Sequence, residues 1–165
     1  MKFFAMDIGS TYLKTALLDC DTKTITMFPE RSMPKAFTGA DSLSHEIDAE
    51  GLYNTVKNAL DACIAKEKNA VSGVLISTQM HGFMFCSKEG QPHTPYISWQ
   101  DNRCLREKEP GISYLDYLKS IISPEMMASH GLYLKPGLGF CNAYTAIREK
   151  KYNIEDGWFS MIRKE

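Results

Sequence analysis

Three β-prone runs follow one another closely at the start of the chain, at residues 3–8, 12–18 and 24–28. Only Gly9, Ser10 and Thr11 separate the first two runs, and such a short connection containing glycine is typical of a tight hairpin. An Asp-Thr-Lys turn precedes the third run, and Pro29 follows it. The spacing therefore predicts a three-stranded antiparallel meander at the N-terminus.

The next signal is a change from β-type to helical spacing. Residues 30–47 carry proline, glycine and several Ser and Asp residues, which indicates a loop. Beyond Asp48, a predicted N-cap, apolar residues recur on one helical stripe, formed by Leu52, Val56, Ala59, Leu60, Cys63 and Ile64. A β-run rich in branched residues follows at 71–77, and a strand reached through a helix usually lies parallel to a neighbour in the same sheet. The first half therefore predicts an α/β fold.

The second half of the chain has shorter elements. Runs at 83–86 and 95–99 predict a small hairpin, and Ser113 and Ser123 each predict the start of a helix. A glycine-rich loop at 135–139 precedes a predicted helix over about 142–150. Close to the end, an apolar cluster carries no stop signal, and we expect the fold to continue beyond these residues. The cluster consists of Trp158, Phe159, Met161 and Ile162.

Length and composition restrict the class of protein. A chain of 165 residues with 44% hydrophobic residues is long enough for one domain that buries roughly 70% of its unfolded surface. Nineteen Lys and Arg nearly balance twenty Asp and Glu, and because these charges are scattered we expect neither nucleic acid nor a membrane surface as partner. We expect no signal peptide, because MKFFAM is too short for its apolar region. We also expect no membrane helix, because no apolar run reaches the ~20 residues that one needs.

The cysteines indicate a compartment. Five of them are spread along the chain without a CxxC pair or a histidine at zinc-ligand spacing. We therefore expect buried, reduced thiols in a cytoplasmic protein. They are Cys20, Cys63, Cys86, Cys104 and Cys141.

The stretch MDIGST, residues 6–11, has the residues of a phosphate site. Asp7, at the end of the first strand, can hold Mg²⁺ through its water, while the amides of Gly9, Ser10 and Thr11 can bind a phosphate and Lys14 can supply a counter-charge. The alternative is an ordinary turn, because Asp and Gly are common turn formers. Neither a Walker A sequence nor GxGxxG occurs in the chain.

Two further stretches interrupt hydrophobic runs with polar residues. In ISTQMHGFMF, Gln79 and His81 can exchange hydrogen bonds with hydroxyl groups, while Met80 offers an apolar wall. The alternative is a structural or exposed histidine. In ISWQDNR, Trp99 can pack on the C–H face of a sugar, and Asp101 with Arg103 can form an orienting ion pair. The alternative there is a buried tryptophan beside a surface salt bridge.

Together, in this order and spacing, the three stretches resemble the N-terminal domain of the FGGY carbohydrate kinases, over nearly the whole chain. The resemblance implies a ribonuclease H-like core of the actin-like ATPase superfamily, which agrees with the order of elements predicted above. QMHG is most similar to the xylulokinase branch, and WQD is also similar to glycerol kinases. The implied activity is transfer of the γ-phosphate of MgATP to a hydroxyl of a ketose or polyol, with a xylulose-like sugar favoured.

Residue by residue, the resemblance implies that Asp7 lies near Mg²⁺ and the transferred phosphate. It makes Gly9, Ser10, Thr11 and Lys14 the phosphate loop. Gln79, Met80 and His81 then belong to the sugar site, with Trp99, Asp101 and Arg103 as the substrate-side wall and its support.

The chain also departs from the family pattern. The family's general base is an aspartate in a later Gly-Asp motif, which nothing after Arg103 matches, and its ATP-binding C-terminal domain has no counterpart in these residues. We therefore expect residues 1–165 to be a truncated N-terminal kinase domain that is inactive alone. The alternative is a non-catalytic sugar-binding module, or one that forms homodimers. A metal-dependent nuclease on the same core is disfavoured because only Asp7 is suitably placed.

Overall fold

A computed structural model describes residues 1–37, 41–67, 70–152 and the backbone of 158–161. The sequence predicts one domain, and the structure divides it into two compact units. The first comprises Met1–Lys35 and Asp48–Met80, and the second comprises Ala36–Ile47 and His81–Met161.

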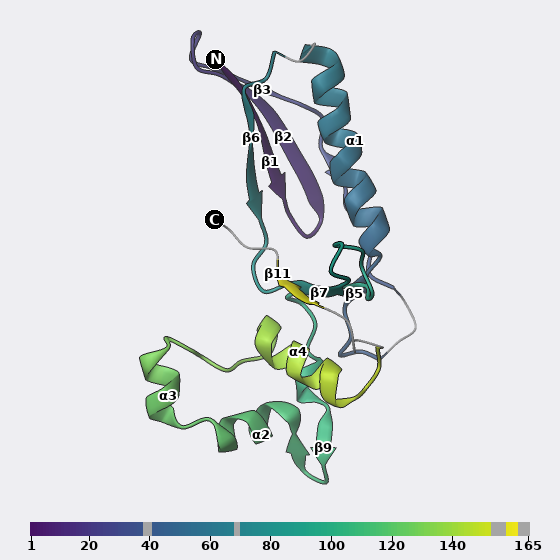
Figure 1. Ribbon diagram of the computed structural model, residues 1–165, viewed down its shortest axis with the longest axis vertical. Coiled ribbons are helices and arrows are strands. Elements are labelled where there is room, and N and C mark those ends of the chain that lie inside the picture. The colour runs from purple at the N-terminus through teal and green to yellow at the C-terminus, as the bar shows by residue number, and fades with distance from the viewer. Residues whose placement is uncertain (38–40, 68–69, 153–157, 162–165) are drawn as a thin grey trace. The chain divides into compact units, whose positions relative to one another are not determined.

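The first unit is built on a mixed sheet with strand order β3-β2-β1-β6 (Figure 1). Strands β1, β2 and β3 form the predicted antiparallel meander, and β6 lies parallel to β1. A short strand, β4, also pairs with β2 inside the segment predicted as a loop. The strands are β1 (Lys2–Ile8), β2 (Tyr12–Asp19), β3 (Thr24–Met27), β4 (Arg31–Ser32) and β6 (Gly73–Thr78).

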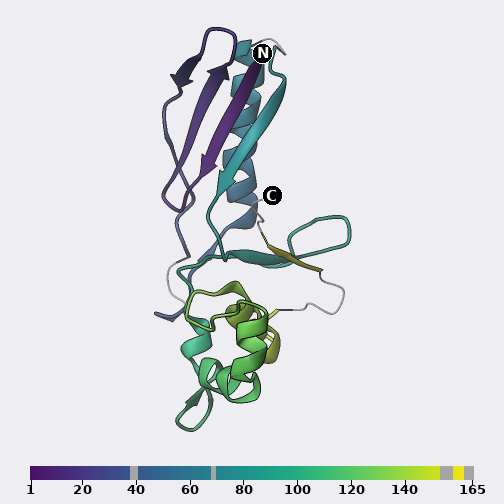
Figure 2. The same ribbon diagram turned by 90° about the vertical axis from the view of Figure 1, so that its left-hand side faces the viewer.

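Helix α1 (Ala49–Glu67) lies along one face of this sheet (Figure 2). The predicted cap at Asp48 is confirmed, because its carboxylate accepts the Gly51 N–H at 3.0 Å. The helix buries Leu52, Ala59 and Cys63, three members of the predicted stripe. The order of meander, helix and parallel strand is therefore as the sequence predicts.

The opposite face of the same sheet is rich in exposed apolar side chains. Ile25 and Met27 of β3 are 68% and 63% exposed, and Leu75 of β6 is 48% exposed. The strand register puts Met27 opposite Ala16 and Leu75 beside Ala5, so these residues share one face. Among the described residues of this unit, no helix covers that face.

The second unit has a four-stranded antiparallel sheet of order β11-β7-β8-β5. The predicted hairpin is present as β7 and β8, joined at Phe83 and Ile97. Strand β5 lies in the stretch predicted as a loop. It was not predicted because two residues are too few for a recognisable alternation. The strands are β5 (Glu46–Ile47), β7 (Phe83–Cys86), β8 (Tyr96–Ile97) and β11 (Trp158–Met161), and Ile162 of the predicted apolar cluster lies outside the described residues.

Helices of the second unit begin largely where the sequence predicts. The hydroxyls of Ser113 and Ser123 cap two helices by accepting the N–H groups of Asp116 and Met126. The last helix begins at Gly139, ahead of the expected start. The remaining elements are η1 (Arg103–Leu105), the hairpin β9 (Glu107–Glu109) and β10 (Ile112–Ser113), and the helices α2 (Tyr114–Ile121), α3 (Pro124–Ser129) and α4 (Gly139–Arg148).

All five cysteines are free, four of them are buried, and Cys20 is exposed, contrary to the expectation for that residue. None of the helices in the described ranges combines the length and hydrophobicity needed to cross a membrane.

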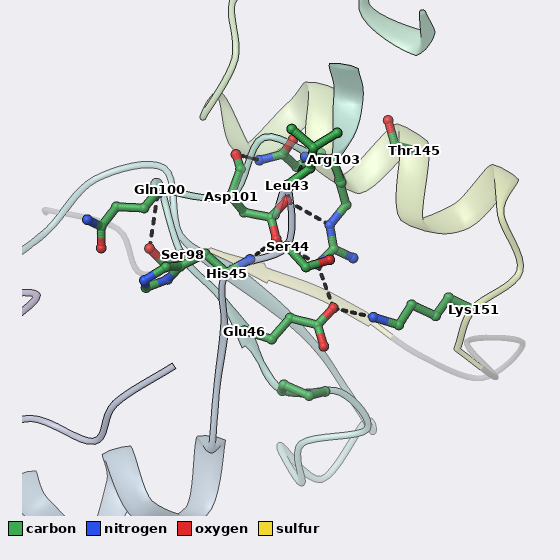
Figure 3. Close-up of polar contacts among 12 residues, drawn as sticks. Leu43, Ser44, His45, Glu46, Ser98, Gln100, Asp101, Arg103, Thr145 and Lys151 are labelled. Atoms are coloured by element: carbon green, nitrogen blue, oxygen red, sulfur yellow. Dashed lines mark hydrogen bonds and ion pairs between the residues drawn. The ribbon is translucent and has the colours of Figure 1, made fainter. Parts of the chain in front are cut away.

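A buried ion network centres on Arg103, whose side chain is fully enclosed (Figure 3). Its guanidinium donates to both carboxylate oxygens of Asp101 at 2.8 Å and to Glu46 Oε1 at 2.6 Å. Lys151 Nζ donates to the same Glu46 oxygen at 2.6 Å, and the Tyr152 hydroxyl also donates to it. The network therefore joins β5, the segment after β8 and the segment after α4.

In this network, hydrogen bonds and ion pairs together affect the pKa of Glu46 more than burial does. Burial alone would raise the pKa of Glu46, but hydrogen bonds from Lys151, Tyr152 and Arg103 lower it below its ordinary value. Asp101 accepts two further bonds, from the backbone N–H groups of Arg103 and His45 at 3.0 and 2.7 Å. Each buried carboxylate thus has several partners, as buried charges require.

Replacing Arg103 with Met should strongly destabilise the protein, because it leaves the carboxylates of Asp101 and Glu46 buried without their main partner. We expect the free energy of unfolding, measured by urea denaturation, to fall by about 3–5 kcal/mol. The control is Lys57→Met, which removes an exposed pair with Asp61 and should leave stability close to wild type. Equal stability of the two variants would contradict the assigned role of Arg103.

Candidate functional site

The first group of candidate residues lies at one end of the first sheet. Asp7 of β1 is exposed and lies opposite Lys14 of β2, with Ser77 of β6 as its parallel neighbour. The three residues line an open groove of about 410 Å³. The Lys14 ammonium is 3.8 Å from the carboxylate of Glu30, so its charge is only loosely paired. The structure therefore brings an accessible carboxylate, a hydroxyl and a cation to one sheet surface.

The turn between β1 and β2 corrects one prediction. The Gly9 N–H donates to the Tyr12 carbonyl at 3.1 Å, so it closes the turn and is not free to bind a phosphate. A Cβ at Gly9 would lie 2.9 Å from the same oxygen, which explains the glycine. Within the described residues, the N–H groups of Ser10 and Thr11 have no acceptor. The predicted phosphate loop is thus reduced to these two amides and their hydroxyls.

The groups around Asp7 suit a magnesium ion that takes most of its ligands from water and phosphate, rather than a metal ion coordinated by protein side chains alone. No cluster of three or more His, Cys, Asp or Glu side chains suitable for a metal occurs in the described residues. Mg²⁺ commonly keeps several waters and takes one or two carboxylates together with substrate phosphates. One exposed carboxylate beside free amides fits that pattern.

The second group forms a pocket within the second unit. His81 and Trp99, both predicted from the sequence, line a cavity of about 390 Å³. His81 has a left-handed backbone (φ 66°), and the Trp99 side chain is 45% exposed. The other members of the lining are not among the site residues predicted from the sequence. They are Gln100, Asn102, Lys135, Pro136 and Gly137.

Two glycines allow the loop at 135–139 to lie close to the backbones of Trp99 and His81. A Cβ at Gly137, whose φ is 77°, would lie 2.4 Å from the Trp99 carbonyl oxygen. A Cβ at Gly139 would lie 2.8 Å from the His81 carbonyl oxygen. Since any side chain would separate these backbones, glycine allows the loop to form one wall of the pocket.

A buried amide and a buried phenol contact the segments that carry Trp99 and His81. Asn142 of α4 donates to the Asp101 carbonyl at 2.7 Å, which ties the helix to the segment that carries Trp99. Gly82 lies directly against Tyr96, because a Cβ there would be 1.8 Å from the Tyr96 hydroxyl. Burial raises the pKa of Tyr96 to about 12, and its hydroxyl has no hydrogen-bond partner among the described residues.

Two of the residues predicted for the substrate site, Asp101 and Arg103, have buried side chains. Both are fully buried, and Arg103 forms ion pairs with Asp101 and with Glu46. The predicted ion pair is confirmed, but it lies inside the protein rather than on the pocket surface. Its effect on a ligand can only be indirect, by fixing the backbone between Trp99 and Asn102.

The two residues before His81 belong to the first unit. Met80 is 64% exposed, and Gln79 Oε1 is buried without a hydrogen-bond partner among the described residues. Neither lines the cavity that contains His81 and Trp99. Their predicted role in substrate binding stays a prediction.

The pocket offers groups suited to a hydroxylated ligand. An indole face packs on C–H groups, and the side-chain amides of Gln100 and Asn102 both donate and accept. Neither amide side chain has a hydrogen bond to another described residue. An imidazole and an ammonium complete the polar lining.

Known carbohydrate kinases are similar to this chain in sequence and in fold. A xylulose kinase from Staphylococcus xylosus is 29% identical over 107 residues, which are 63% of this chain and 21% of that protein. Xylulose kinase from Rhodospirillum rubrum superposes with a TM-score of 0.71 at 16% identity, over 91% of this chain and 30% of the other. Plasmodium falciparum glycerol kinase gives 0.70 at 14% identity, over 91% and 29%.

These likenesses confirm the fold, a ribonuclease H-like domain of the actin-like ATPase type. The chain spans about a fifth of the curated relative and about a third of the two solved structures. A sequence model described as "FGGY family of carbohydrate kinases, N-terminal domain" matches residues 3–127. The match covers most of the chain, which therefore belongs to the FGGY family of carbohydrate kinases.

Proposed function

We propose that this chain supplies the sugar-binding side of an ATP-dependent kinase that phosphorylates a hydroxyl of a ketose or polyol. The observation that carries the proposal is the pocket in which His81 and Trp99 stand beside the free amides of Gln100 and Asn102. The family supports the reaction class, and the similarity to a xylulose kinase makes xylulose the first ligand to test.

In this proposal each pocket residue has a distinct task. The indole of Trp99 packs on the C–H face of the sugar, and the two amides and His81 exchange hydrogen bonds with its hydroxyls. The buried pair of Asp101 and Arg103 is a positioning element, because it fixes the backbone that carries Trp99. ATP as donor also suggests the cytoplasm as the compartment.

Asp7 is the proposed holder of Mg²⁺, through a bound water. The backbone N–H groups of Ser10 and Thr11 are the proposed hydrogen-bond donors to the phosphate. When bound, the metal would neutralise charge on the phosphate oxygens. The loosely paired Lys14 adds a positive charge to the same sheet surface.

Loss of the imidazole should weaken sugar binding. In titration calorimetry of the 165-residue polypeptide with D-xylulose and xylitol, His81→Ala should raise the dissociation constant about three- to tenfold, the cost of one hydrogen bond. His93→Ala is the matched control, because His93 is exposed and lies outside the pocket. Equal affinity of both variants would remove His81 from the site, and failure of the wild type to bind either ligand would refute the proposed function.

The 165-residue polypeptide should not catalyse phosphoryl transfer from ATP to a sugar by itself. An attacking hydroxyl must lose its proton, a step typically worth 10²- to 10⁴-fold, and these residues contain no Gly-Asp motif to supply the base. A coupled assay for ADP release with MgATP and D-xylulose should therefore give the rate of the blank. Sugar-dependent ADP release above that rate, unchanged in Asp7→Asn, would overturn this expectation and the role of Asp7 together.

A second candidate function is a non-catalytic module that binds sugar and pairs with a second copy. It is favoured by the exposed Ile25, Met27 and Leu75 on the open sheet face, and by the position of β6 at the sheet edge. Sedimentation velocity over a concentration series should then show a dimer that Leu75→Glu abolishes and Glu89→Lys, in an exposed turn, does not. A strict monomer at all concentrations would exclude this candidate.

A further inference from the structure

Two residues of the pocket lining, Trp99 and Gln100, are the central residues of one β-turn. The Asp101 N–H donates to the Ser98 carbonyl at 3.1 Å and closes the turn. The Gln100 N–H also donates to the Ser98 hydroxyl at 3.0 Å (Figure 3). Ser98 and Asp101 are buried, whereas Trp99 is 45% exposed. The turn therefore presents two side chains of the pocket from a buried base.

The two ends of this turn are held by different elements. At its start, the Ser98 N–H donates to the His45 carbonyl at 3.1 Å. At its end, the Asp101 carbonyl accepts the side-chain amide of Asn142 at 2.7 Å. Asn142 is thus the residue through which α4 holds the turn.

The side chain of Asn142 suits both backbone groups that it contacts. Its Nδ2 donates to the Asp101 carbonyl, and its Oδ1 accepts the Cys104 N–H at 3.4 Å. An amide supplies one donor and one acceptor side by side, whereas a carboxylate or an ammonium supplies only one of the two. Asn142 is fully buried. An apolar side chain there would remove both hydrogen bonds and leave buried polar groups without them.

The residues that lead into Asn142 also contact the backbone of the other predicted pocket residue. Gly137 lies against the Trp99 carbonyl, and Gly139, the first residue of α4, lies against the His81 carbonyl. Residues 137–142 therefore contact the segments that carry His81 and Trp99. The position of the first turn of α4 consequently affects both sides of the pocket.

We propose that Asn142 is a positioning residue for sugar binding, because it holds the β-turn that presents Trp99 and Gln100 to the ligand. The inference rests on the proposed function of the pocket as a sugar site. It gives α4 control over the affinity for sugar, although no side chain of this helix lines the pocket.

Thr145 provides a matched control in the same helix. Like Asn142 it is fully buried, but its hydroxyl donates to the Cys141 carbonyl at 3.0 Å, within α4. Asn142→Leu and Thr145→Val each replace a buried polar side chain with an apolar one of similar size. Both should lower the melting temperature, but only Asn142→Leu should release the β-turn.

The first test measures affinity. In titration calorimetry of the 165-residue polypeptide with D-xylulose and xylitol, Asn142→Leu should raise the dissociation constant about three- to tenfold. The physical reason is that the ligand must then order the turn as it binds. Thr145→Val should bind as the wild type does, at a temperature at which both variants are folded. Wild-type affinity in Asn142→Leu, or an equal loss of affinity in both variants, would overturn the inference.

The second test needs no ligand. The chain has two tryptophans, so Trp158→Phe leaves Trp99 as the only one. In this background, Asn142→Leu should increase acrylamide quenching of the Trp99 fluorescence, and Thr145→Val should leave it unchanged. Asn142→Ser, whose hydroxyl can still donate to the Asp101 carbonyl, should give an intermediate value.

The two tests separate the inference from the proposed function. If Asn142→Leu does not fold, Asn142→Ser carries both measurements against Thr145→Val. Unchanged quenching in the Asn142 variants would overturn the inference, even if the wild type binds sugar. Failure of the wild type to bind either sugar would refute the proposed function and with it the role in sugar binding, whereas altered quenching would still support the hold of Asn142 on the turn.

Discussion

The second unit depends on the buried ion pairs that the Arg103 guanidinium forms with Asp101 and Glu46. One enclosed cation joins the carboxylates of Asp101 and Glu46, which are far apart in sequence, and Lys151 and Tyr152 complete the set. Buried ion pairs seldom add net stability relative to apolar packing, but they specify one arrangement because every alternative leaves a charge unpaired. In this protein the specified arrangement includes the backbone from Trp99 to Asn102, which forms part of the pocket.

The pocket is therefore assembled from parts with different physical origins. Trp99 is placed by the ion network and by the Asn142 amide beneath it. Lys135 and Gly137 are placed by close backbone approach, for which glycine is required. His81 follows the first unit directly in sequence and adopts a left-handed conformation that is uncommon for a non-glycine residue. Because each wall is fixed independently of a ligand, the pocket exists before anything binds.

Local sequence patterns were sufficient to predict most of the first unit, although not the short strand β4. The individual runs of the meander, the cap at Asp48 and the β-run at 71–77 each follow from a pattern over fewer than twenty residues, which is the range in which periodicity is informative. The pairing of Asp101 with Arg103 was predictable for the same reason. The role of Glu46 was not, because a two-residue strand has no pattern and its partner lies 57 positions away. Lys135 and Gly137 were missed similarly, although the proline and glycine of that loop did indicate a turn. The hydrogen bond that occupies the Gly9 amide is a detail of turn geometry that residue type alone does not reveal.

The contact between Gly82 and Tyr96 has an evolutionary consequence. The phenol occupies the space that a side chain at position 82 would need, and its hydroxyl gains no hydrogen bond there among the described residues. The ring thus fills volume, and the glycine is constrained by the ring rather than by its own backbone. Positions 82 and 96 should consequently drift as a coupled pair. A larger residue at 82 becomes tolerable only in a background where a shorter side chain already stands at 96, and the order in which the two changes arise decides whether the intermediate folds.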